Sequence, residues 1–334
     1  MQDLDLRSAI RTTASITLVV IMAVMNAAAS SAQEATGGAG VLNFGGIPWE
    51  QYVSQKRGTF FNMASLTSGT YSKKAALSLA EAAKLSYADG PTIDKQAREW
   101  GFSGAKFLNS GGTQAFIALS ERVLLIAFRG TTDLADWIDN LTLTSTARPY
   151  GKIHTGFLGS FQRVEQNVRA AVAKAGNRVV WFTGHSLGGA IATATAAEMK
   201  DDLPRAGIVT FGQPQVGFGD LKTFVDDAFG GRYQRYVNAN DPVASIPPWP
   251  WQHVNLLRHV GVRAGGDKGA AKGPTAMTPE EFEEFRREVR RLDTGLKRSG
   301  KSARNLKGLR LKGRVRWISD HYLDNYIAAI ERHK

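Results

Sequence analysis

The sequence predicts an α/β protein whose central sheet is mostly parallel and is flanked by helices on both faces. From residue 178 onward, short runs rich in β-branched and aromatic residues alternate with alanine-rich or amphipathic segments of helical length. Such alternation is typical of parallel strands that helices cover on both sides. The length of 334 residues, 43% of them hydrophobic and 22% charged, suits one large domain or two small ones.

Each element is predicted from its own pattern. Residues 72–88 have apolar positions at helical spacing, and residues 106–130 form three apolar runs broken by Asn-Ser-Gly-Gly and Ser-Glu, which indicates an antiparallel meander. We expect further helices at residues 159–175 and 187–200 and at the C-terminal end of the chain. Further strands are expected at residues 178–184, 206–212, 232–238 and 314–318, with another strand region near residues 259–264.

The first 32 residues have the parts of an export signal. Arg7 and Arg11 precede a short apolar run over residues 14–25, and small residues lead up to Ala32. The run is short for a bilayer span, so we expect cleavage near Ala32 and a secreted or periplasmic mature protein. An uncleaved anchor is the alternative. Residues 33–70 are expected to be a glycine-rich leader before the main domain.

The composition also limits the chemistry that the chain can perform. There is no cysteine, so neither disulfide bonds nor a thiolate metal site can form. The six histidines show no paired spacing such as His-x-x-x-His. We therefore expect neither a metal nor a cofactor.

The stretch Gly184-His185-Ser186-Leu187-Gly188 fits the pattern Gly-x-Ser-x-Gly and lies between a predicted strand and a predicted helix. This is the context of a nucleophile elbow, in which the serine sits on a turn so tight that its neighbours two residues away must be glycines. We predict that Ser186 is a nucleophile held in a strained conformation. A plain glycine-rich turn is the alternative.

A nucleophilic serine needs a base and a carboxylate that orients the base, and in elbow proteins they follow the serine in the order Asp or Glu, then His. Ligand sites of parallel sheets lie at the carboxyl ends of the strands. Asp241 follows the predicted strand 232–238, and His321 follows the predicted strand 314–318. Ser186, Asp241 and His321 are therefore expected to converge on one edge of the sheet.

The other histidines fit this arrangement less well. His154 precedes the serine, and His185 is next to it and is expected to point away from it. His259 follows Asp241 closely and remains the alternative base. For Asp241 itself, the alternative is a structural Asp-Pro turn.

Two backbone segments are candidates for an oxyanion hole. Leu187 supplies the N–H of the residue after the nucleophile. The apolar stretch LLIAFRGTT predicts a strand that ends at Arg129-Gly130-Thr131, where the glycine allows close approach and Thr131 can offer its N–H and its hydroxyl. The alternative for this second segment is an ordinary turn at a strand end.

The residues that follow Thr131 predict a short amphipathic helix. Leu134, Trp137, Ile138 and Leu141 share one face, and aspartates occupy the other. Next to an oxyanion loop, this helix can be a lid that opens at a lipid surface. An ordinary surface helix packed on the core explains the pattern equally well.

Six stretches of the chain together resemble the signature blocks of a known family. They are AFRGTTDLADWIDNL, IHTGFLGSF, FTGHSLGGAIA, VTFGQPQVGFGD, NANDPVASIPP and SDHYLDNYI, in this order. The chain resembles the class 3 lipases, which are α/β-hydrolase-type serine esterases of the triacylglycerol lipase kind, over about residues 70–330. Six ordered blocks are far more specific than the serine pentapeptide alone.

The resemblance implies a secreted enzyme that hydrolyses carboxylic esters of lipids through an acyl-enzyme, with a catalytic domain over residues 71–334. It places the triad at Ser186, Asp241 and His321, the oxyanion hole at Thr131 and Leu187, and the lid region at residues 132–141. A phospholipase A-type enzyme that acts on anionic bilayers is one alternative. A non-catalytic protein that binds anionic surfaces is the other.

A basic insertion at about residues 266–312 departs from the family pattern. Thr278, Pro279 and Glu281 are typical of a helix start, and Phe282, Phe285, Val289 and Leu292 give that helix an apolar side. Residues 286–316 carry thirteen Lys and Arg against two acidic residues, which is +11 of the chain's net charge of +12.

This charge leaves three interpretations of the insertion. It can be a solvated loop, or residues 286–316 can contact the anionic surface of a membrane, where each basic residue contributes about 1 kcal/mol. Nucleic acid is not expected as a partner, because no aromatic residue lies among the basic residues between Lys297 and Arg316.

Overall fold

The structure, a computed structural model, describes residues 47–56, 58–203, 205–254, 256–261, 276–299 and 318–333. The chain divides into two compact units, and all of these residues belong to the second, which begins at Gly40. The predicted signal sequence with its cleavage site, the first part of the leader and most of the basic residues after 299 lie outside the described residues.

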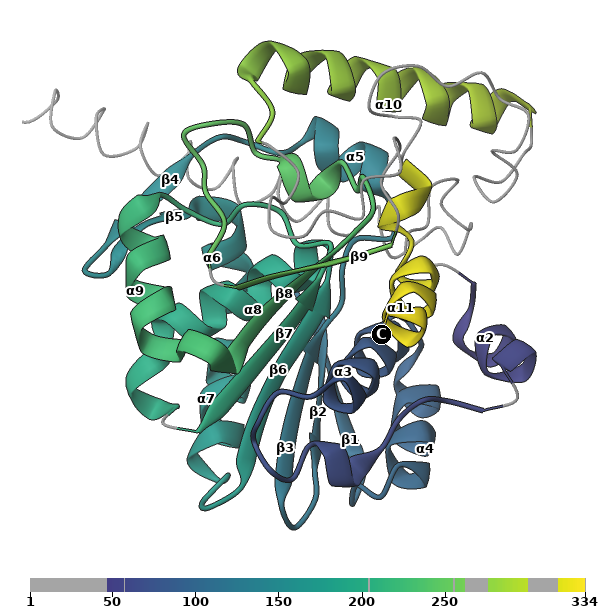
Figure 1. The fold of residues 1–334 in the computed structure, drawn as a ribbon, viewed down its shortest axis with the longest axis vertical. Coiled ribbons are helices and arrows are strands. Elements are labelled where there is room, and N and C mark those ends of the chain that lie inside the picture. Colours follow the sequence, from purple (N-terminus) through teal and green to yellow (C-terminus); the bar gives the residue numbers. More distant parts are fainter. Residues whose placement is uncertain are drawn as a thin grey trace, which may run out of the picture. The chain divides into compact units, whose positions relative to one another are not determined.

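Within this described part, the strands form one seven-stranded sheet in the order β1-β2-β3-β6-β7-β8-β9 and a separate hairpin of β4 and β5 (Figure 1). The meander β1-β2-β3 is antiparallel, as predicted, and all pairs from β3 to β9 are parallel. The strands are β1 (Ala105–Ser110), β2 (Thr113–Leu119), β3 (Val123–Phe128), β4 (Ser145–Arg148), β5 (Gly151–His154), β6 (Val179–His185), β7 (Ala206–Phe211), β8 (Tyr233–Asn238) and β9 (Leu256–Val260).

Helices cover both faces of the sheet, which confirms the predicted fold class. One face packs against α3 (Lys73–Leu85), α4 (Gly90–Glu99) and α11 (Leu323–Arg332), and the other against α6 (Thr155–Gln162), α7 (Glu165–Ala173), α8 (Leu187–Glu198) and α9 (Gly219–Phe229). The described residues also include α2 (Trp49–Lys56), α5 (Leu134–Asp139), α10 (Pro279–Ser299) and the short 3-10 helices η1 (Met63–Ser65), η2 (Lys200–Asp202), η3 (Gly230–Arg232) and η4 (Val243–Ser245).

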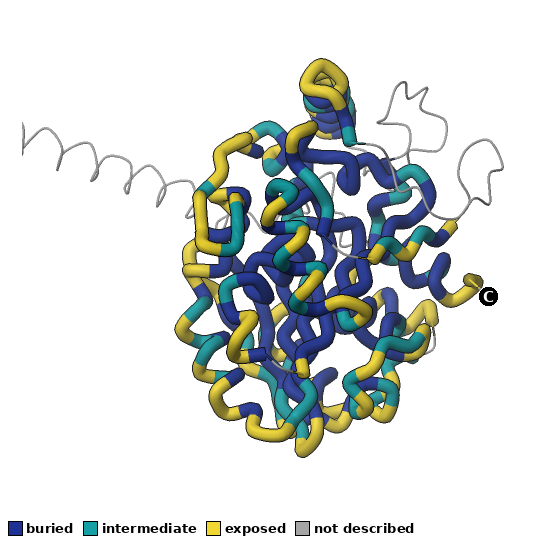
Figure 2. Tube along the Cα trace, turned by 60° about the vertical axis from the view of Figure 1, so that its left-hand side comes forward, coloured by how far each residue is buried: buried dark blue, intermediate teal, exposed yellow. Residues whose placement is uncertain are grey.

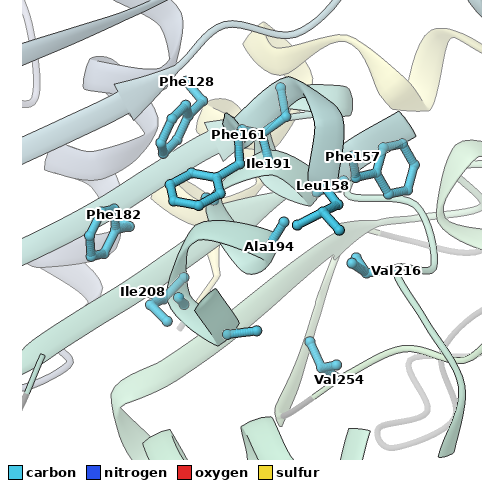
Figure 3. Close-up of a cluster of buried hydrophobic side chains, with 14 of the residues drawn as sticks. Phe128, Phe157, Leu158, Phe161, Phe182, Ile191, Ala194, Ile208, Val216 and Val254 are labelled. Carbon is cyan, nitrogen blue, oxygen red and sulfur yellow. The ribbon is translucent and has the colours of Figure 1, made fainter. Parts of the chain in front are cut away.

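Helix α8 lies at the centre of the larger hydrophobic core. It is rich in alanine, and every residue from Gly188 to Ala197 is buried, because the sheet packs on one side of the helix and α6 on the other. Figure 3 shows Phe182 and Ile208 of the strands and Phe161 of α6 around Ile191 and neighbouring residues of α8. The tube in Figure 2 shows the same pattern, with the strands buried and the outer helix faces exposed. The helix that carries Leu187 therefore has a fixed position on the sheet.

Three segments differ from the sequence prediction. The expected helix 159–175 is two helices, because the chain leaves helical geometry at Val164 (φ −116°, ψ 0°) between α6 and α7. Part of the expected leader forms helix α2, and Trp49 and Tyr52 of that helix are buried. Of the expected strand 314–318, only Ile318 is described, and it begins a 3-10 turn that runs to His321.

The part of the basic insertion that the structure describes is a helix. At the start of α10, the N–H of Glu281 donates to Oγ1 of Thr278 (3.2 Å), and the N–H of Thr278 donates to a carboxylate oxygen of Glu281 (2.9 Å). This is the reciprocal cap that the sequence predicts. None of the helices within the described ranges is long and apolar enough to cross a membrane.

Candidate active site

Ser186 occupies the sharp turn between β6 and α8. Its backbone has φ 58° and ψ −129°, a region that residues other than glycine rarely adopt. A Cβ on Gly184 would lie 2.3 Å from the carbonyl carbon of Gly188, and a Cβ on Gly188 would lie 2.2 Å from the carbonyl oxygen of Phe128. The strained turn that the sequence predicts is therefore present, and both glycines are required because the backbone around them is packed too closely for a side chain.

Asp241 and His321 form a buried pair. Asp241 follows β8 and lies 80 residues from His321 in the sequence, yet its Oδ2 is 2.8 Å from Nδ1 of His321, and both side chains are fully buried. The other carboxylate oxygen accepts the N–H of Val243 at 2.8 Å, which fixes the rotation of the carboxylate. A carboxylate only accepts, so Nδ1 carries the proton and Nε2 of a neutral His321 can take up another.

The three predicted residues meet at the carboxyl edge of the parallel strands. A Cβ on Gly212, directly after β7, would lie 2.8 Å from Oδ2 of Asp241 and 2.9 Å from the ring of His321. The N–H of Ser186 donates to the carbonyl oxygen of Phe211, one residue before that glycine, at 2.9 Å. Ser186 is 1% exposed, and its Oγ has no hydrogen-bond partner among the described residues. The candidate nucleophile is thus closed off from solvent.

Tyr326 is a third partner of the carboxylate that the sequence did not reveal. It lies on α11, and its hydroxyl donates to Oδ2 of Asp241 at 2.5 Å. Burial beside the negative carboxylate raises the pKa of Tyr326 well above its ordinary value, so the phenol stays protonated and keeps donating. The only sequence signal is its position in the C-terminal helix, five residues after His321.

His185 does not simply point away from the site. Its Nε2 is 2.8 Å from the carbonyl oxygen of His321, and its Nδ1 is 3.0 Å from the hydroxyl of Tyr87. A carbonyl can only accept, so Nε2 is the donor and Nδ1 accepts from Tyr87. Burial lowers the pKa of His185 well below its ordinary value, which keeps the ring in this neutral form.

The loop after β3 lies directly beside the serine. A Cβ on Gly130 would lie 2.2 Å from the hydroxyl of Tyr87 and 3.2 Å from Cβ of Ser186, so only a glycine fits there. The hydroxyl of Thr131 forms two hydrogen bonds within its own loop. It donates to the carbonyl oxygen of Asp133 at 3.0 Å and accepts the N–H of Asp133 at 3.2 Å. Leu187 is the first residue of α8. The Thr131 hydroxyl, one of the donors expected for an oxyanion hole, thus already donates to Asp133.

His259 and His154 contact backbone carbonyl oxygens through their ring nitrogens. His259 lies on β9, and its Nε2 is 2.7 Å from the carbonyl oxygen of Ala239, directly after β8, whereas the carboxylate of Asp241 is paired with His321. His154 is buried between the carbonyl oxygen of Thr142 and the ring of Phe157, and burial lowers its pKa to about 4. Within the described ranges, no group of three or more histidine, aspartate or glutamate residues could hold a metal ion.

The predicted amphipathic helix is α5, and it starts three residues after Thr131. Leu134, Ile138 and Leu141 are buried, and Trp137 is half-buried, so the apolar face is covered. The carboxylate of Asp133 caps the helix by accepting the N–H of Asp136 at 3.0 Å. The helix is therefore continuous with the loop that touches Ser186.

Part of this chain is similar to known proteins. Residues 125–251, from β3 through Asp241, match the model of the family described as "Lipase (class 3)". The chain is 35% identical over 146 residues to "Secreted mono- and diacylglycerol lipase 1" of Fusarium solani, a match that covers 41% of this chain and 44% of that protein. It is 31% identical over 155 residues to "Phospholipase A(1) DAD1, chloroplastic" of Arabidopsis thaliana, covering 39% and 34%.

A solved structure with a partly similar fold is lipase II from Rhizopus niveus, with a TM-score of 0.48, 24% sequence identity, and coverage of 61% of this chain and 83% of that chain. The matched region spans less than half the length of the curated relatives named above. Residues 125–251 include the turn at Ser186, the candidate oxyanion loop and Asp241, whereas His321 lies beyond them. The part of the chain from residue 125 to residue 251 is thus similar to class 3 lipases.

Proposed function

We propose that the protein is a serine esterase that hydrolyses carboxylic ester bonds of lipids. The observation that carries the proposal is the juxtaposition of a serine in an elbow with φ 58° and a buried His321–Asp241 pair at the same edge of the sheet. A strained serine beside an imidazole that a carboxylate orients is the arrangement that activates a hydroxyl for acyl transfer.

In this proposal, Oγ of Ser186 attacks the ester carbonyl carbon and its proton passes to Nε2 of His321. Asp241 keeps the ring in the tautomer with Nδ1 protonated and stabilises the imidazolium. The tetrahedral intermediate then breaks its bond to the alcohol oxygen, and the alcohol leaves with the proton from His321. Water hydrolyses the acyl-enzyme through the same residues in the reverse order.

The negative oxygen of the tetrahedral intermediate requires donors that are in place before the reaction. We assign the backbone N–H of Leu187, at the first position of α8, and the N–H of Thr131 to this role. The Thr131 hydroxyl contributes by holding Asp133, since its contacts are both to that residue. No cofactor takes part in these steps.

For the substrate, we favour acylglycerol esters of the triacylglycerol lipase kind, since the matched family is described as lipases and the relative from Fusarium solani is named a mono- and diacylglycerol lipase. The second candidate is a phospholipase A-type activity on anionic bilayers. It is favoured by the net charge of +11 in residues 286–316 and by the match to a phospholipase A(1). A purely non-catalytic surface-binding role does not account for the buried and oriented Asp241–His321 pair.

We also propose that the protein is exported. The support is the charged, apolar and small-residue order of residues 1–32, with cleavage near Ala32, and a relative whose name describes it as secreted. Helix α5 is proposed as the lid, because it continues the loop beside Ser186. Its apolar residues are buried against the protein, as expected of a lid that is closed when no lipid is present. Both proposals fit an enzyme that works outside the cytoplasm on a lipid surface.

The decisive experiment replaces the nucleophile. Ser186→Ala is expected to lower turnover of emulsified triglyceride, of phospholipid vesicles and of a soluble short-chain ester by about 10⁴-fold or more, with an unchanged melting temperature. The wild-type rates on the same three substrates decide between lipase and phospholipase. Activity of the variant above a few per cent of wild type, after contaminating hydrolases are excluded, would refute the mechanism.

A further inference from the structure

Helix α10 packs against the proposed lid helix α5 (Figure 1). Nε of Arg290 is 2.7 Å from Oδ2 of Asp139, the last residue of α5, and the two are 151 residues apart in the sequence. A second guanidinium, that of Arg286, donates to the carbonyl oxygen of Leu141 at 3.0 Å, just beyond the end of α5. Both contacts bind the C-terminal end of α5, so α10 restrains the end of the helix that is farther from Ser186.

The two helices also share apolar contacts. Phe282, Phe285, Val289 and Leu296 of α10 are at most 2% exposed and belong to the same buried cluster as the apolar residues of α5. Their spacing places them on one side of a 21-residue helix whose opposite side is charged. In water, α10 and α5 therefore hide each other's apolar faces, and neither can move away alone without exposing them.

The polar part of this contact is incompletely satisfied. Oδ1 of Asp139 and Nε of Arg286 are both buried, and neither has a hydrogen-bond partner among the described residues. A buried polar atom without a partner destabilises the arrangement that holds it. The contact between α10 and α5 is thus held mainly by its apolar side, and separation would allow both polar groups to find partners.

The position of α5 affects the candidate active site directly. The helix continues the loop of Gly130 and Thr131, and the hydroxyl of Thr131 is bonded to Asp133 at the start of α5. Ser186 is 1% exposed and His321 is fully buried, so an ester can reach them only after a movement. A restraint on α5 is therefore a restraint on access to the site and on the oxyanion loop.

We propose that α10 is a latch on the lid: it holds α5 closed in water and releases it at a lipid surface with anionic headgroups. This inference rests on the proposed function. The lipid interior takes over the apolar side of α10, and phosphate groups take over Arg286 and Arg290, because a guanidinium binds phosphate through two parallel hydrogen bonds.

The charge distribution along α10 orients this contact. The first turns carry four glutamates, whereas the residues from Arg286 to Arg298 carry six basic side chains against Glu288 and Asp293, a net of +4. The first turns are therefore repelled from an anionic surface and the remainder is attracted. Arg286 and Arg290, which contact α5 from the middle of α10, belong to the part of the helix that the surface attracts.

The test is a reversible cross-link between the two helices. The chain has no cysteine, so the pair Asp139→Cys and Arg290→Cys can be joined specifically by a short bis-methanethiosulfonate reagent and released by reduction. The matched control is the pair Lys222→Cys and Asp226→Cys, which replaces an ion pair within α9, away from α5. We expect the α5–α10 cross-link to lower turnover of emulsified ester at least tenfold, with recovery on reduction, and the control cross-link to change it less than twofold.

A second measurement does not depend on activity. Hydrogen exchange of the backbone amides of residues 134–141 is followed with and without vesicles of phosphatidylcholine and phosphatidylglycerol. Vesicles are expected to speed this exchange in the reduced double variant and not in the cross-linked one. Equal exchange in both forms, or a cross-linked protein that keeps half its turnover on the emulsion, would overturn the latch. If exchange responds as expected while no form hydrolyses any ester, the latch stands and the proposed function fails.

Discussion

The hydroxyl of Tyr326 donates a hydrogen bond to Oδ2 of Asp241, the carboxylate oxygen that also faces His321. The bond links the C-terminal helix to the loop after β8 across 85 residues of sequence. Because the contact of Tyr326 with the triad is to this carboxylate, we expect Tyr326 to act on the proposed chemistry through the placement of Asp241.

Tyr326→Phe removes this bond and keeps the ring. Since a hydrogen bond to a charged group contributes about 1.5–3 kcal/mol, we expect kcat to fall about tenfold and KM to stay within twofold. Steady-state kinetics on a soluble ester measure both. The matched control is Tyr236→Phe, which removes a hydroxyl that is bonded to Tyr71 at 2.6 Å in the same core. Equal losses in the two variants would show that the effect is one of general packing.

Tyr87→Phe tests the contacts of His185. The hydroxyl of Tyr87 bonds Nδ1 of His185, whose Nε2 in turn binds the backbone of His321, and the same hydroxyl lies against Gly130. Without it, the oxyanion loop and the backbone of His321 lose a common support, so kcat is expected to fall several-fold. Substrate contacts are not removed, so KM should change little. A variant with wild-type kcat would mean that the two segments are held independently.

His321→Ala and His259→Ala separate the two candidate bases. His321 is paired with Asp241, whereas His259 binds the backbone of Ala239. We expect His321→Ala to be nearly as inactive as Ser186→Ala, and His259→Ala to keep most of its turnover with a lower melting temperature. Ester hydrolysis and thermal unfolding are measured on the same preparations. The assignment is wrong if the pattern of activities is reversed.

Glu81 is expected to make the protein less stable as the pH rises. It is fully buried, and burial raises its pKa from 4.5 to about 7, although the Tyr52 hydroxyl donates to it at 2.7 Å. The folded state therefore holds the proton more tightly than the unfolded state. The stabilisation is present in full below about pH 4.5 and is lost as the pH rises to about 7, by about 3 kcal/mol at most.

Glu81→Gln keeps an uncharged acceptor for Tyr52 and removes the titration. We expect the melting temperature of the wild type to fall relative to that of the variant between pH 5 and pH 8, and the difference to level off above that range. The comparison cancels other groups, including Asp320, whose pKa burial raises to about 6, and His154, which acts with the opposite sign. The prediction is contradicted if the melting temperatures of the wild type and of Glu81→Gln differ by the same amount at every pH from 5 to 8.

Much of the fold can be predicted from the sequence because its signals are local. The strands of the meander and of the parallel sheet follow from β-branched and aromatic runs, and the turn at Ser186 follows from two glycines at fixed spacing. The cap of α10 follows from Thr278 and Glu281 alone. Where the signal is weak the prediction fails: apolar positions at helical spacing predict one helix over residues 159–175, but the helix is interrupted at Val164.

The candidate site, too, could be predicted from the sequence only in part. By itself, the sequence located the ends of the strands that precede Ser186 and Asp241, and since parallel strands end at one edge, it predicted that these two residues would be neighbours. His321 was expected after a strand at residues 314–318, but Ile318 begins a 3-10 turn that runs to His321, so only the tertiary structure decided that His321 pairs with Asp241. Only the tertiary structure decided what surrounds them. The roles of Tyr326, Tyr87 and His185 depend on contacts between segments far apart in the chain, and an amphipathic pattern shows that a helix has an apolar side without showing what covers it. That α10 covers α5 depends on the packing of two faces 151 residues apart, which no local pattern encodes.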